Sequence, residues 1–318
     1  MSFAVLRSLQ DWSARFDSEQ RTVVTVGNFD GIHVGHQKIL KMVMARAQET
    51  ATKSVVVTFD PHPFRLLRPD QAPRMIQTLD QRLLGFETMG LNAALVLHFD
   101  LDFSKIPAAD FMQHILVDGL RAQSIMVGEN FRFGYRGTGT VAMLEEFAAG
   151  AGFQVVSIPA LEVAGQIVSS TGIRNAVSSG EMEQAALWLG RPVALTGESR
   201  TGAGRGRTIL FPTLNLVAEQ ELQPAIGVYA TESILAGKSF FSVTNVGRRP
   251  TFDGRDITVE SHLFDFSEIL TFGRMELRFH KRLRGEQKFE SVQDLRAQIA
   301  RDIAAAQEYF EAKKNLKH

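Results

Sequence analysis

Residues 25–36 read T-V-G-N-F-D-G-I-H-V-G-H and join a strand-like run to a helix-like run. The stretch overlaps an apolar run at residues 23–26, and residues 37–50 carry apolar side chains at helical spacing. Glycine lets the backbone approach a ligand closely, and the free N–H groups at a helix start attract anions. The stretch therefore predicts a strand-to-helix turn that binds a phosphate. Its candidate contacts are Gly27, Asn28, Phe29, Asp30 and Gly31.

His33 and His36 make this predicted site more specific. They stand three residues apart at the expected helix start, so both imidazoles can point to the same side. Two imidazoles beside a phosphate indicate charge stabilisation as phosphorus is attacked. For an isolated H-x-x-H, capping or surface histidines are the alternative, and a metal pair would need a third ligand. The strand and the glycines before the pair favour the phosphate site.

The composition excludes several classes of function. The chain of 318 residues is 44% hydrophobic and 22% charged, which suits one large or two ordinary folded domains. Lys plus Arg and Asp plus Glu both number 35, so no global field draws nucleic acid or a membrane. The absence of cysteine excludes disulfides, thiolate metal sites and thiol catalysis.

The N-terminal segment has too short an apolar core for a signal peptide. No run approaches the roughly 18 apolar residues of a membrane span. We therefore expect a soluble, cytoplasmic protein without nucleic-acid or membrane partners. The sequence indicates no oligomeric state.

Strand-like and helix-like runs alternate in the first half of the chain. The strand-like runs lie at 22–27, 54–59, 93–98, 123–128 and 153–158, and the helical patterns lie at 34–51, 78–89, 107–119 and 138–150. This alternation predicts an α/β domain with a parallel sheet covered by helices. Ligands of such sheets bind at the carboxyl ends of the strands.

The pattern changes at residues 189–192, which read L-G-R-P. Strand-like runs with glycine turns follow at 193–200, 227–236, 239–246, 257–264 and 274–281. Without crossover helices, they predict an antiparallel β-barrel. Ser291 then caps a C-terminal amphipathic helix, whose apolar face carries Val292, Leu295, Ile299, Ile303, Ala306 and Phe310. We place the domains at 1–186 and 187–318.

Two segments that follow strands of the predicted sheet carry candidate ligand contacts. His62 lies between two prolines that fix a turn, for which a rigid loop is the alternative. Residues 128–139 read G-E-N-F-R-F-G-Y-R-G-T-G, and their aromatic and arginine side chains suit a planar ring and a phosphate. An ordinary exposed loop is the alternative. The candidates are His62, Asn130, Phe131 and Arg132.

Residues 169–174 read S-S-T-G-I-R and precede a short helical pattern. One hydroxyl is expected to cap this helix, with Arg174 in its first turn, where a cation opposes the helix dipole. A bound triphosphate would explain that cation, and a plain capped helix is the alternative. Ser170, Thr171 and Arg174 are therefore candidate phosphate contacts.

The barrel half contains a second candidate site. Residues 201–215 read T-G-A-G-R-G-R-T-I-L-F-P-T-L-N. Thr213 and Asn215 alternate on an extended segment, which places two neutral oxygens on one face, and such oxygens supplemented by phosphates suit Mg²⁺. Glu260 lies among apolar and small residues, where an ionised carboxylate needs a partner or a task, unless that face of the strand is solvated. A glycine-rich loop could wrap phosphate oxygens, although a plain hairpin also explains its glycines; its candidates are Gly202, Gly204, Arg205, Gly206 and Arg207.

These motifs together resemble the bacterial bifunctional riboflavin kinase/FAD synthetase family. Residues 27–36 resemble the H-x-G-H signature of the nucleotidylyltransferase superfamily, and residues 169–174 resemble its second signature. Residues 206–215 resemble the riboflavin kinase signature G-R-x-x-G-F-P-T-A-N, from which Leu210 and Leu214 depart. Further departures are Asn130, where Asp is common, and Phe272, where Tyr is usual. The resemblance extends over residues 22–302.

The resemblance implies a Rossmann-like nucleotidylyltransferase domain followed by a riboflavin kinase barrel. In the barrel, ATP would phosphorylate riboflavin to FMN, with Glu260 as the base and Mg²⁺ at Thr213 and Asn215. In the N-terminal domain, a second ATP would adenylylate FMN to FAD beside His33, His36 and Arg174. The implied ligands are thus ATP, riboflavin, FMN and FAD, with Mg²⁺ as the cofactor.

Two other interpretations stay open at this point. One domain could be active and the other decayed, which Leu210 would favour by crowding the glycine-rich loop. Alternatively, the protein could be a sensor that binds flavin or nucleotide without turnover. The presence of both His33 and Glu260 argues against a sensor, because binding alone requires neither side chain.

Overall fold

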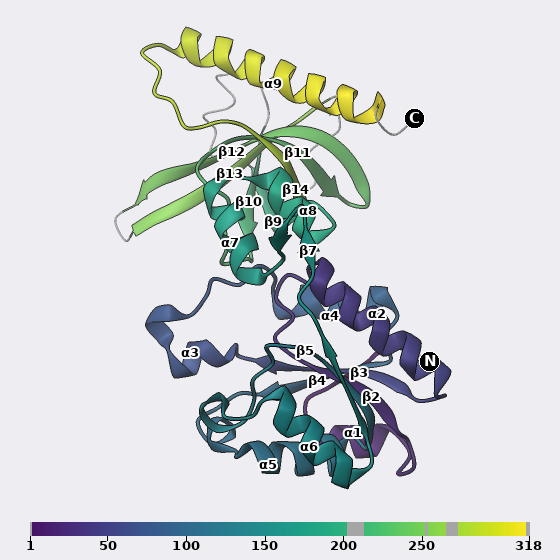
Figure 1. The fold of residues 1–318 in the computed structure, drawn as a ribbon. Helices are drawn as coiled ribbons and strands as arrows, with labels where there is room; N and C mark the ends of the chain where they lie inside the picture. The colour runs from purple at the N-terminus through teal and green to yellow at the C-terminus, as the bar shows by residue number, and fades with distance from the viewer. Residues whose placement is uncertain (1, 202–212, 252–253, 265–272, 316–318) are drawn as a thin grey trace. The chain divides into compact units, whose positions relative to one another are not determined.

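The computed structural model describes residues 2–201, 213–251, 254–264 and 273–315. The chain divides into two compact units, Met1–Ser169 and Ser170–His318 (Figure 1). We describe each unit by itself. The predicted domain boundary at residues 186–187 lies 17 residues after the end of the first unit, and it stays a prediction.

The first unit contains a six-stranded parallel sheet with the order β1-β4-β3-β2-β5-β6. Its strands are β1 Ala4–Leu6, β2 Thr22–Val26, β3 Lys53–Asp60, β4 Ala93–His98, β5 Ala122–Gly128 and β6 Gln154–Ile158. The five predicted strands and the parallel sheet are confirmed. The short edge strand β1 was not predicted, because three residues show no usable periodicity.

Helices cover both faces of this sheet because successive strand residues point to opposite sides. Val56 of β3 packs with Leu40 of α2 Val34–Glu49 and with Phe86 of α4 Leu79–Met89. On the other face, Val55 joins a core with residues of three helices: α1 Leu9–Arg15, the π-helix η3 Phe111–Gly119 and α6 Val141–Ala151. The remaining short elements are α3 Pro63–Leu67, η1 Pro69–Gln71, η2 Phe103–Lys105, α5 Ala108–Asp110, η4 Tyr135–Gly137, β7 Glu162–Val163 and β8 Gln166–Ile167.

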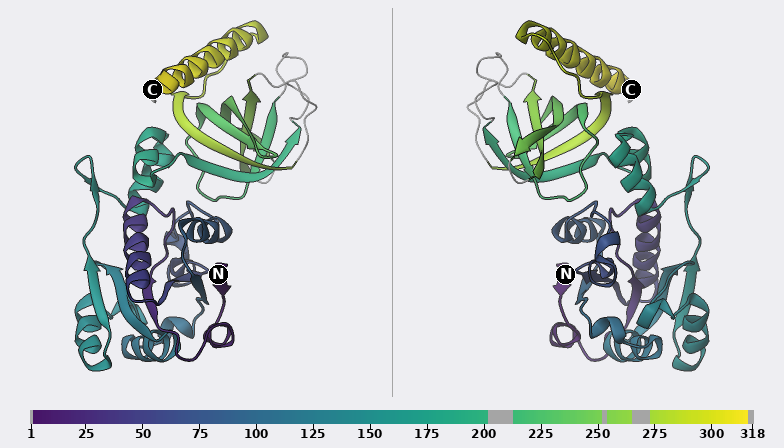
Figure 2. Two further views of the ribbon diagram at one scale, coloured as in Figure 1. Left: turned by 90° about the vertical axis from the view of Figure 1, so that its right-hand side faces the viewer. Right: turned by 90° about the vertical axis from the view of Figure 1, so that its left-hand side faces the viewer.

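The second unit begins with two helices and continues into a closed antiparallel barrel (Figure 2). The helices are α7 Ser170–Ser179 and α8 Met182–Leu189. The strands are β9 Val193–Thr201, β10 Leu214–Ala218, β11 Gly227–Leu235, β12 Lys238–Thr251, β13 Gly254–Leu263 and β14 Arg274–Arg284. The predicted barrel is confirmed, and β10 adds one strand to the five predicted runs.

Buried hydroxyl groups form a hydrogen-bonded chain among the barrel strands. Thr244 Oγ1 lies 2.6 Å from Thr231 Oγ1 and 2.5 Å from Ser261 Oγ, and all three residues are fully buried. Residues on the other face of the same strands, such as Val228 and Val243, pack against the C-terminal helix. The residues opposite the hydroxyls are therefore turned toward this helix, and Glu260 and Asn245 are among them.

The C-terminal helix α9 Val292–Asn315 forms as predicted, and Ser291 Oγ accepts the backbone N–H of Asp294 at 3.1 Å. Val292 is 54% exposed, although it continues the apolar face of the helix. The side chains that α9 buries belong to its later turns, namely Asp302, Ala306 and Phe310. The first turn therefore leaves Val292 uncovered.

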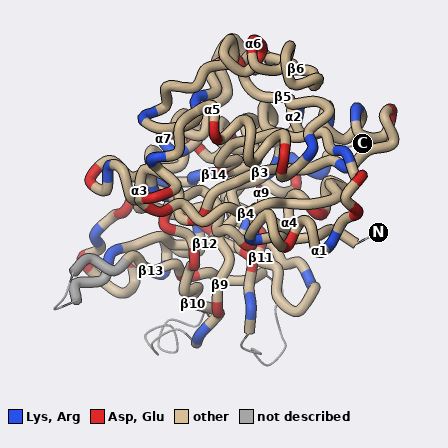
Figure 3. The backbone as a smooth tube through the Cα atoms, turned by 90° about the horizontal axis from the view of Figure 1, so that it is seen from below, with Lys and Arg blue, Asp and Glu red and all other residues tan. Residues whose placement is uncertain are grey.

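Basic and acidic residues are interspersed along the chain (Figure 3). Within the described ranges, no helix is both long and apolar enough to cross a membrane.

Candidate active sites

The histidine pair lies where the sequence predicts, at the start of α2. His33 is the N-cap residue, and its Nδ1 accepts the backbone N–H of His36 at 3.2 Å. The two imidazoles are stacked, with ring centroids 3.6 Å apart and planes inclined by 18°. Gly35 permits this arrangement, because a Cβ atom there would lie 3.2 Å from two atoms of the His33 ring. Both rings therefore point to one side of the helix start.

The two histidines are not simply a pair of cations. Burial lowers the pKa of His36 well below its ordinary value of 6.5, and the neighbouring His33 lowers this pKa further. His36 is therefore neutral near pH 7. Because Nδ1 of His33 accepts a hydrogen bond, a neutral His33 carries its proton on Nε2. A neutral imidazole can then donate to a phosphate oxygen.

The loop between β2 and α2 is held by a buried carboxylate. Gly31 has φ of +87°, a conformation that glycine adopts without strain. Asp30 is 2% exposed, and its carboxylate accepts the backbone N–H groups of Ile76 and Gln77 at 3.1 Å. These contacts assign the Asp30 side chain to fixing the loop. Asp30 is thus better suited to shape the phosphate site than to contact phosphate directly.

Arg82 of α4 also anchors this loop, and sequence reasoning did not identify it. The side chain is 3% exposed, and its Nη1 donates to the carbonyl of Asn28 at 2.8 Å and to Thr58 Oγ1 at 3.0 Å. Burial lowers the pKa of Arg82, while the charges of Asp30 and Asp60 oppose that shift. A buried arginine between the end of β3 and the glycine loop fixes both backbone segments.

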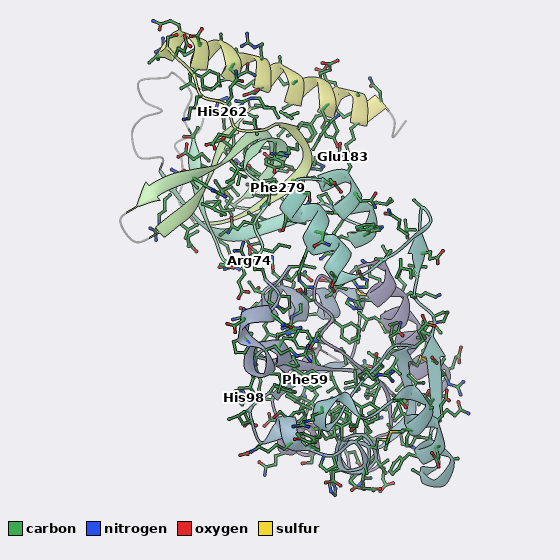
Figure 4. The ribbon with its side chains drawn as sticks, turned by 60° about the vertical axis from the view of Figure 1, so that its left-hand side comes forward. Phe59, Arg74, His98, Glu183, His262 and Phe279 are labelled. Carbon is green, nitrogen blue, oxygen red and sulfur yellow. The ribbon has the colours of Figure 1, made fainter. Side chains whose placement is uncertain are left out.

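An aromatic cavity of about 730 Å³ opens beside Gly27 and Asn28. Its phenylalanines come from four separate segments of the chain: Phe59, Phe64, Phe99, Phe103, Phe111, Phe131 and Phe133. Their rings contact one another, for example Phe131 and Phe133, which stack with centroids 5.3 Å apart. Figure 4 marks Phe59 among these side chains. The guanidinium groups of Arg68, Arg132 and Arg136 also line the cavity. Such a cavity suits a flat ring system that carries an anionic group.

The structure brings two of the four predicted ring contacts to this cavity. Phe131 and Arg132 line it, whereas Asn130 is exposed and His62 does not line it. His62 is instead the N-cap residue of α3, and its Nδ1 accepts the backbone N–H of Phe64 at 3.2 Å. Phe64 lies on the cavity wall, so His62 acts on the cavity through the helix that it caps.

The residues of the second signature lie on α7. Ser170 and Thr171 form its first two positions, as expected for hydroxyl groups near a helix start. The sequence predicts Arg174 in the first turn of this helix. In the structure, Arg174 is the fifth residue of α7 and therefore lies beyond the first turn. The helix begins earlier than expected, because Ser170 is already helical.

A second cavity, of about 350 Å³, lies on the outer face of the barrel. The polar residues on its wall are Thr213, Asn245, Glu260, His262, Arg284, Glu286, Gln287 and Asp302. Figure 4 shows His262 on the side of the barrel next to α9. Leu295 and Ile299 of α9 complete the wall with apolar surface. Thr213 and Glu260, two predicted site residues far apart in sequence, therefore meet in one cavity.

The strand register explains this meeting. Glu260 of β13 is directly opposite Asn215 of β10 on one side and Asn245 of β12 on the other. Directly opposed residues share a face of the sheet, and Thr213 shares it because it precedes Asn215 by two positions. A carboxylate thus lies between two amide side chains, beside a threonine hydroxyl.

Comparisons with known proteins match both halves of the chain. Residues 16–172 match the FAD synthetase family, and residues 189–310 match the riboflavin kinase family. The bifunctional riboflavin kinase/FMN adenylyltransferase of Escherichia coli (strain K12) is 34% identical over 293 residues, which cover 92% of this chain and 94% of that protein. The chain belongs to this bifunctional family.

Other relatives agree with this assignment. The bifunctional riboflavin kinase/FMN adenylyltransferase of Pseudomonas fluorescens is 37% identical over 286 residues, which cover 89% of this chain and 91% of that protein. Among solved structures, a protein from Streptococcus pneumoniae named macrolide-efflux protein is similar, with 26% identity and a TM-score of 0.85. That likeness covers 96% of this chain and 99% of the other, so the whole fold is shared.

In the terms of this family, the histidine pair and the aromatic cavity lie in the FAD synthetase part, and Glu260 lies in the riboflavin kinase part. The candidate residues of the glycine-rich loop, Gly202, Gly204, Arg205, Gly206 and Arg207, lie outside the described residues. Sequence reasoning did not assign Asn245 to the site. It also missed the aromatic cavity, because four separate segments supply its rings.

Proposed function

We propose that the barrel cavity converts riboflavin and ATP to FMN and ADP, and that the N-terminal domain, residues 1–186, converts FMN and a second ATP to FAD and pyrophosphate. The observation that carries this proposal is the placement of Glu260 between Asn215 and Asn245 on the wall of a cavity. A separate cavity, lined by Gly27 and Asn28 of the loop that leads to the histidine pair, supports the second reaction. We also propose that the protein is located in the cytoplasm.

In the kinase reaction, the Glu260 carboxylate accepts the proton of the terminal hydroxyl of riboflavin. The hydroxyl oxygen attacks the γ-phosphorus of ATP, the bond to the β,γ-bridging oxygen breaks, and ADP leaves. Strand pairing places the Glu260 carboxylate beside Asn215 and Asn245, and Leu295 and Ile299 exclude water from one side. A general base in such a position contributes roughly 10² to 10⁴ in rate.

Thr213 and Asn215 are the residues that would hold Mg²⁺. They fit this ion because a hydroxyl and an amide supply hard oxygen ligands that ATP phosphates can complete. Within the described ranges, no cluster of three or more His, Asp or Glu residues could hold a metal without such help. When bound, Mg²⁺ supplies charge neutralisation for the transferring phosphoryl group.

In the adenylyl transfer, a phosphate oxygen of FMN attacks the α-phosphorus of ATP and pyrophosphate leaves. The nucleophile is already anionic, so the protein mainly positions the reactants and stabilises charge. His33 and His36 donate hydrogen bonds to phosphate oxygens, and the backbone of residues 27–31 approaches the phosphates. The aromatic cavity takes the flavin ring. We assign Ser170, Thr171 and Arg174 to the triphosphate.

Product analysis tests the proposed function. The purified full chain is incubated with riboflavin, ATP and Mg²⁺, and in parallel with FMN, ATP and Mg²⁺, and the flavins are separated by chromatography. We expect FMN and then FAD in the first reaction, and FAD in the second. FMN alone would support one decayed domain, and bound flavin without product would support a sensor.

A further inference from the structure

Arg284 and Asp302 form a forked ion pair at the edge of the kinase cavity. Arg284 is the last residue of β14, and Asp302 lies in α9. Arg284 Nε donates to Asp302 Oδ1 at 2.9 Å, and Nη2 donates to Oδ2 at 2.8 Å. The side chains are 21% and 7% exposed. Two parallel hydrogen bonds fix both distance and orientation, which a single contact cannot do.

Further hydrogen bonds occupy both partners. The third nitrogen of Arg284, Nη1, donates to the carbonyl of Gly285 at 2.9 Å. Gln298 Nε2, one turn earlier in α9, donates to Asp302 Oδ1 at 2.8 Å. A guanidinium engaged at every nitrogen would have to break these contacts to bind a phosphate. The ion pair is therefore suited to hold structure and not to contact the reacting groups.

The position of the pair along α9 shows what it holds. The later turns of α9 pack on the barrel through apolar contacts, such as the stacked rings of Phe241 and Phe310 at 4.1 Å. The earlier turns supply Leu295 and Ile299 to the cavity wall. Asp302 lies at the junction of these two parts. The pair thus ties the cavity-lining part of the helix to the end of β14.

The same arginine also orders the loop that completes the wall. The Arg284 guanidinium lies 5.8 Å from the centroid of the Phe289 ring, and Phe289 lines the cavity. Glu260, in contrast, is held by pairing of β13 with β10 and β12, to which neither partner of the ion pair belongs. The wall and the catalytic carboxylate therefore have separate supports.

We propose that Arg284 and Asp302 are positioning residues that set the affinity of the kinase cavity for riboflavin. This proposal rests on the proposed kinase function. Loss of the pair loosens the wall formed by Phe289, Leu295 and Ile299, where a planar ring would pack. The affinity for riboflavin then falls, while Glu260 still accepts the proton once riboflavin is bound.

Steady-state kinetics of the full chain test this role, with Asp302→Asn and Arg284→Lys. Asp302→Asn keeps the shape and removes the charge, and Arg284→Lys keeps the charge and removes the fork. We expect KM for riboflavin to rise about tenfold or more and kcat to stay within about threefold, because uniform binding is lost and transition-state contacts are kept. FAD formation from supplied FMN should stay within about twofold.

The chain offers a matched control on the same barrel. Arg274 forms a forked pair with Glu219, with both nitrogen–oxygen distances 2.9 Å, and neither residue lines the cavity. Arg274→Lys should therefore leave KM for riboflavin within about twofold. Gln298→Ala, which removes one contact to Asp302 and keeps the ion pair, should raise KM less than Asp302→Asn does.

Three results would overturn the proposal. In folded variants, an unchanged KM would show that the ion pair does not affect riboflavin affinity. A fall in kcat at unchanged KM would show that the pair acts in the phosphoryl transfer step. Loss of cooperative melting in Gln298→Ala as well as Asp302→Asn would assign the pair to folding. Riboflavin binding, followed by flavin fluorescence, is measured in parallel without turnover. If the wild-type protein makes no FMN, the proposed kinase function is refuted. The riboflavin affinities of the wild type and the variants would still test the role of the ion pair.

Discussion

Glu260 and Asn215 are paired directly across β13 and β10, so the carboxylate and the amide project from the same face of the barrel. The opposed Cα atoms of such a pair lie about 4.5–5.5 Å apart. One register therefore fixes the spacing between the proposed base and a proposed Mg²⁺ ligand. A shift by one residue would turn both side chains into the barrel, where the buried hydroxyl chain lies.

Glu260→Gln is expected to lower riboflavin phosphorylation by about 10² to 10⁴, because the amide keeps the shape and cannot accept a proton. FAD formation from supplied FMN should continue. Glu198, an exposed glutamate on β9, offers a matched control, since Glu198→Gln removes a strand carboxylate away from the cavity. Unchanged FMN production by Glu260→Gln would show that this carboxylate is structural.

His33→Ala is expected to lower FAD formation from FMN by about 10² to 10³, the usual effect of losing one group that stabilises transition-state charge. The kinase reaction should stay nearly unchanged. His98→Ala serves as the control, because His98 is exposed at the end of β4 and does not line the aromatic cavity. Full FAD synthesis by His33→Ala would remove this histidine from the proposed mechanism.

The second unit should be separable as a kinase. Its α8 buries Met182 and Ala185, and the backbone N–H of Ala225 donates to the carbonyl of Val177 of α7 at 3.2 Å. A fragment that begins at Ser170 keeps these contacts and should convert riboflavin to FMN without making FAD. A fragment that begins at Leu187, after the proposed domain boundary, should also be active but melt at a lower temperature. Losing one buried Met side chain alone costs about 1.5–3 kcal/mol.

Thermal melts and product analysis of both fragments check this expectation. A folded Ser170 fragment without kinase activity would mean that the barrel site needs residues of the first unit. Equal melting temperatures for the two fragments would instead show that α7 and α8 contribute nothing to the barrel.

His280 predicts a pH dependence of barrel stability. Burial and the charge of Lys313 lower its pKa to about 4, Glu232 opposes this shift, and Arg278 adds to it. Lys313 Nζ lies 2.8 Å from His280 Nδ1. Between pH 6.5 and about 4 the unfolded chain binds a proton that the folded barrel does not, so stability falls as the pH drops. The loss is of the order of 1–3 kcal/mol.

Urea unfolding of the Ser170 fragment at several pH values measures this effect. His280→Gln should flatten the dependence between pH 6.5 and 4, relative to the wild type, because it removes the titrating ring. The carboxylates titrate in both proteins and cancel in the comparison. Identical curves would show that His280 is not the source.

Much of the fold was predictable because its elements have strong periodicity. The alternating strands and helices of the first unit, and α9 with its Ser291 cap, follow from local patterns that the structure confirms. Local patterns do not show how much of a helix its partner covers, so the exposure of Val292 could not be predicted from the sequence. The π-helix η3 and the short strand β1 likewise depend on tertiary packing.

The candidate sites were predictable where one short segment carries them. The placement of His33 and His36 on one side of a helix start follows from their spacing, whereas the opposition of Asn215 and Glu260 depends on the register of strands that lie far apart in the sequence. The contact of Arg82 with Asn28 joins residues 54 apart, and the pair of Arg284 and Asp302 joins a strand to a helix. No local sequence pattern indicates such contacts, because they depend on how separately predicted elements pack.

The two proposed sites are separate and act in succession, and a mixing experiment tests this most directly. Glu260→Gln and His33→Ala are each incubated with riboflavin, ATP and Mg²⁺, separately and together, and FAD is measured by chromatography. We predict almost no FAD from either variant alone and substantial FAD from the mixture, because FMN released by the His33 variant reaches the intact adenylylation site of the Glu260 variant. A mixture that makes no FAD, under conditions where the wild type does, would contradict the account.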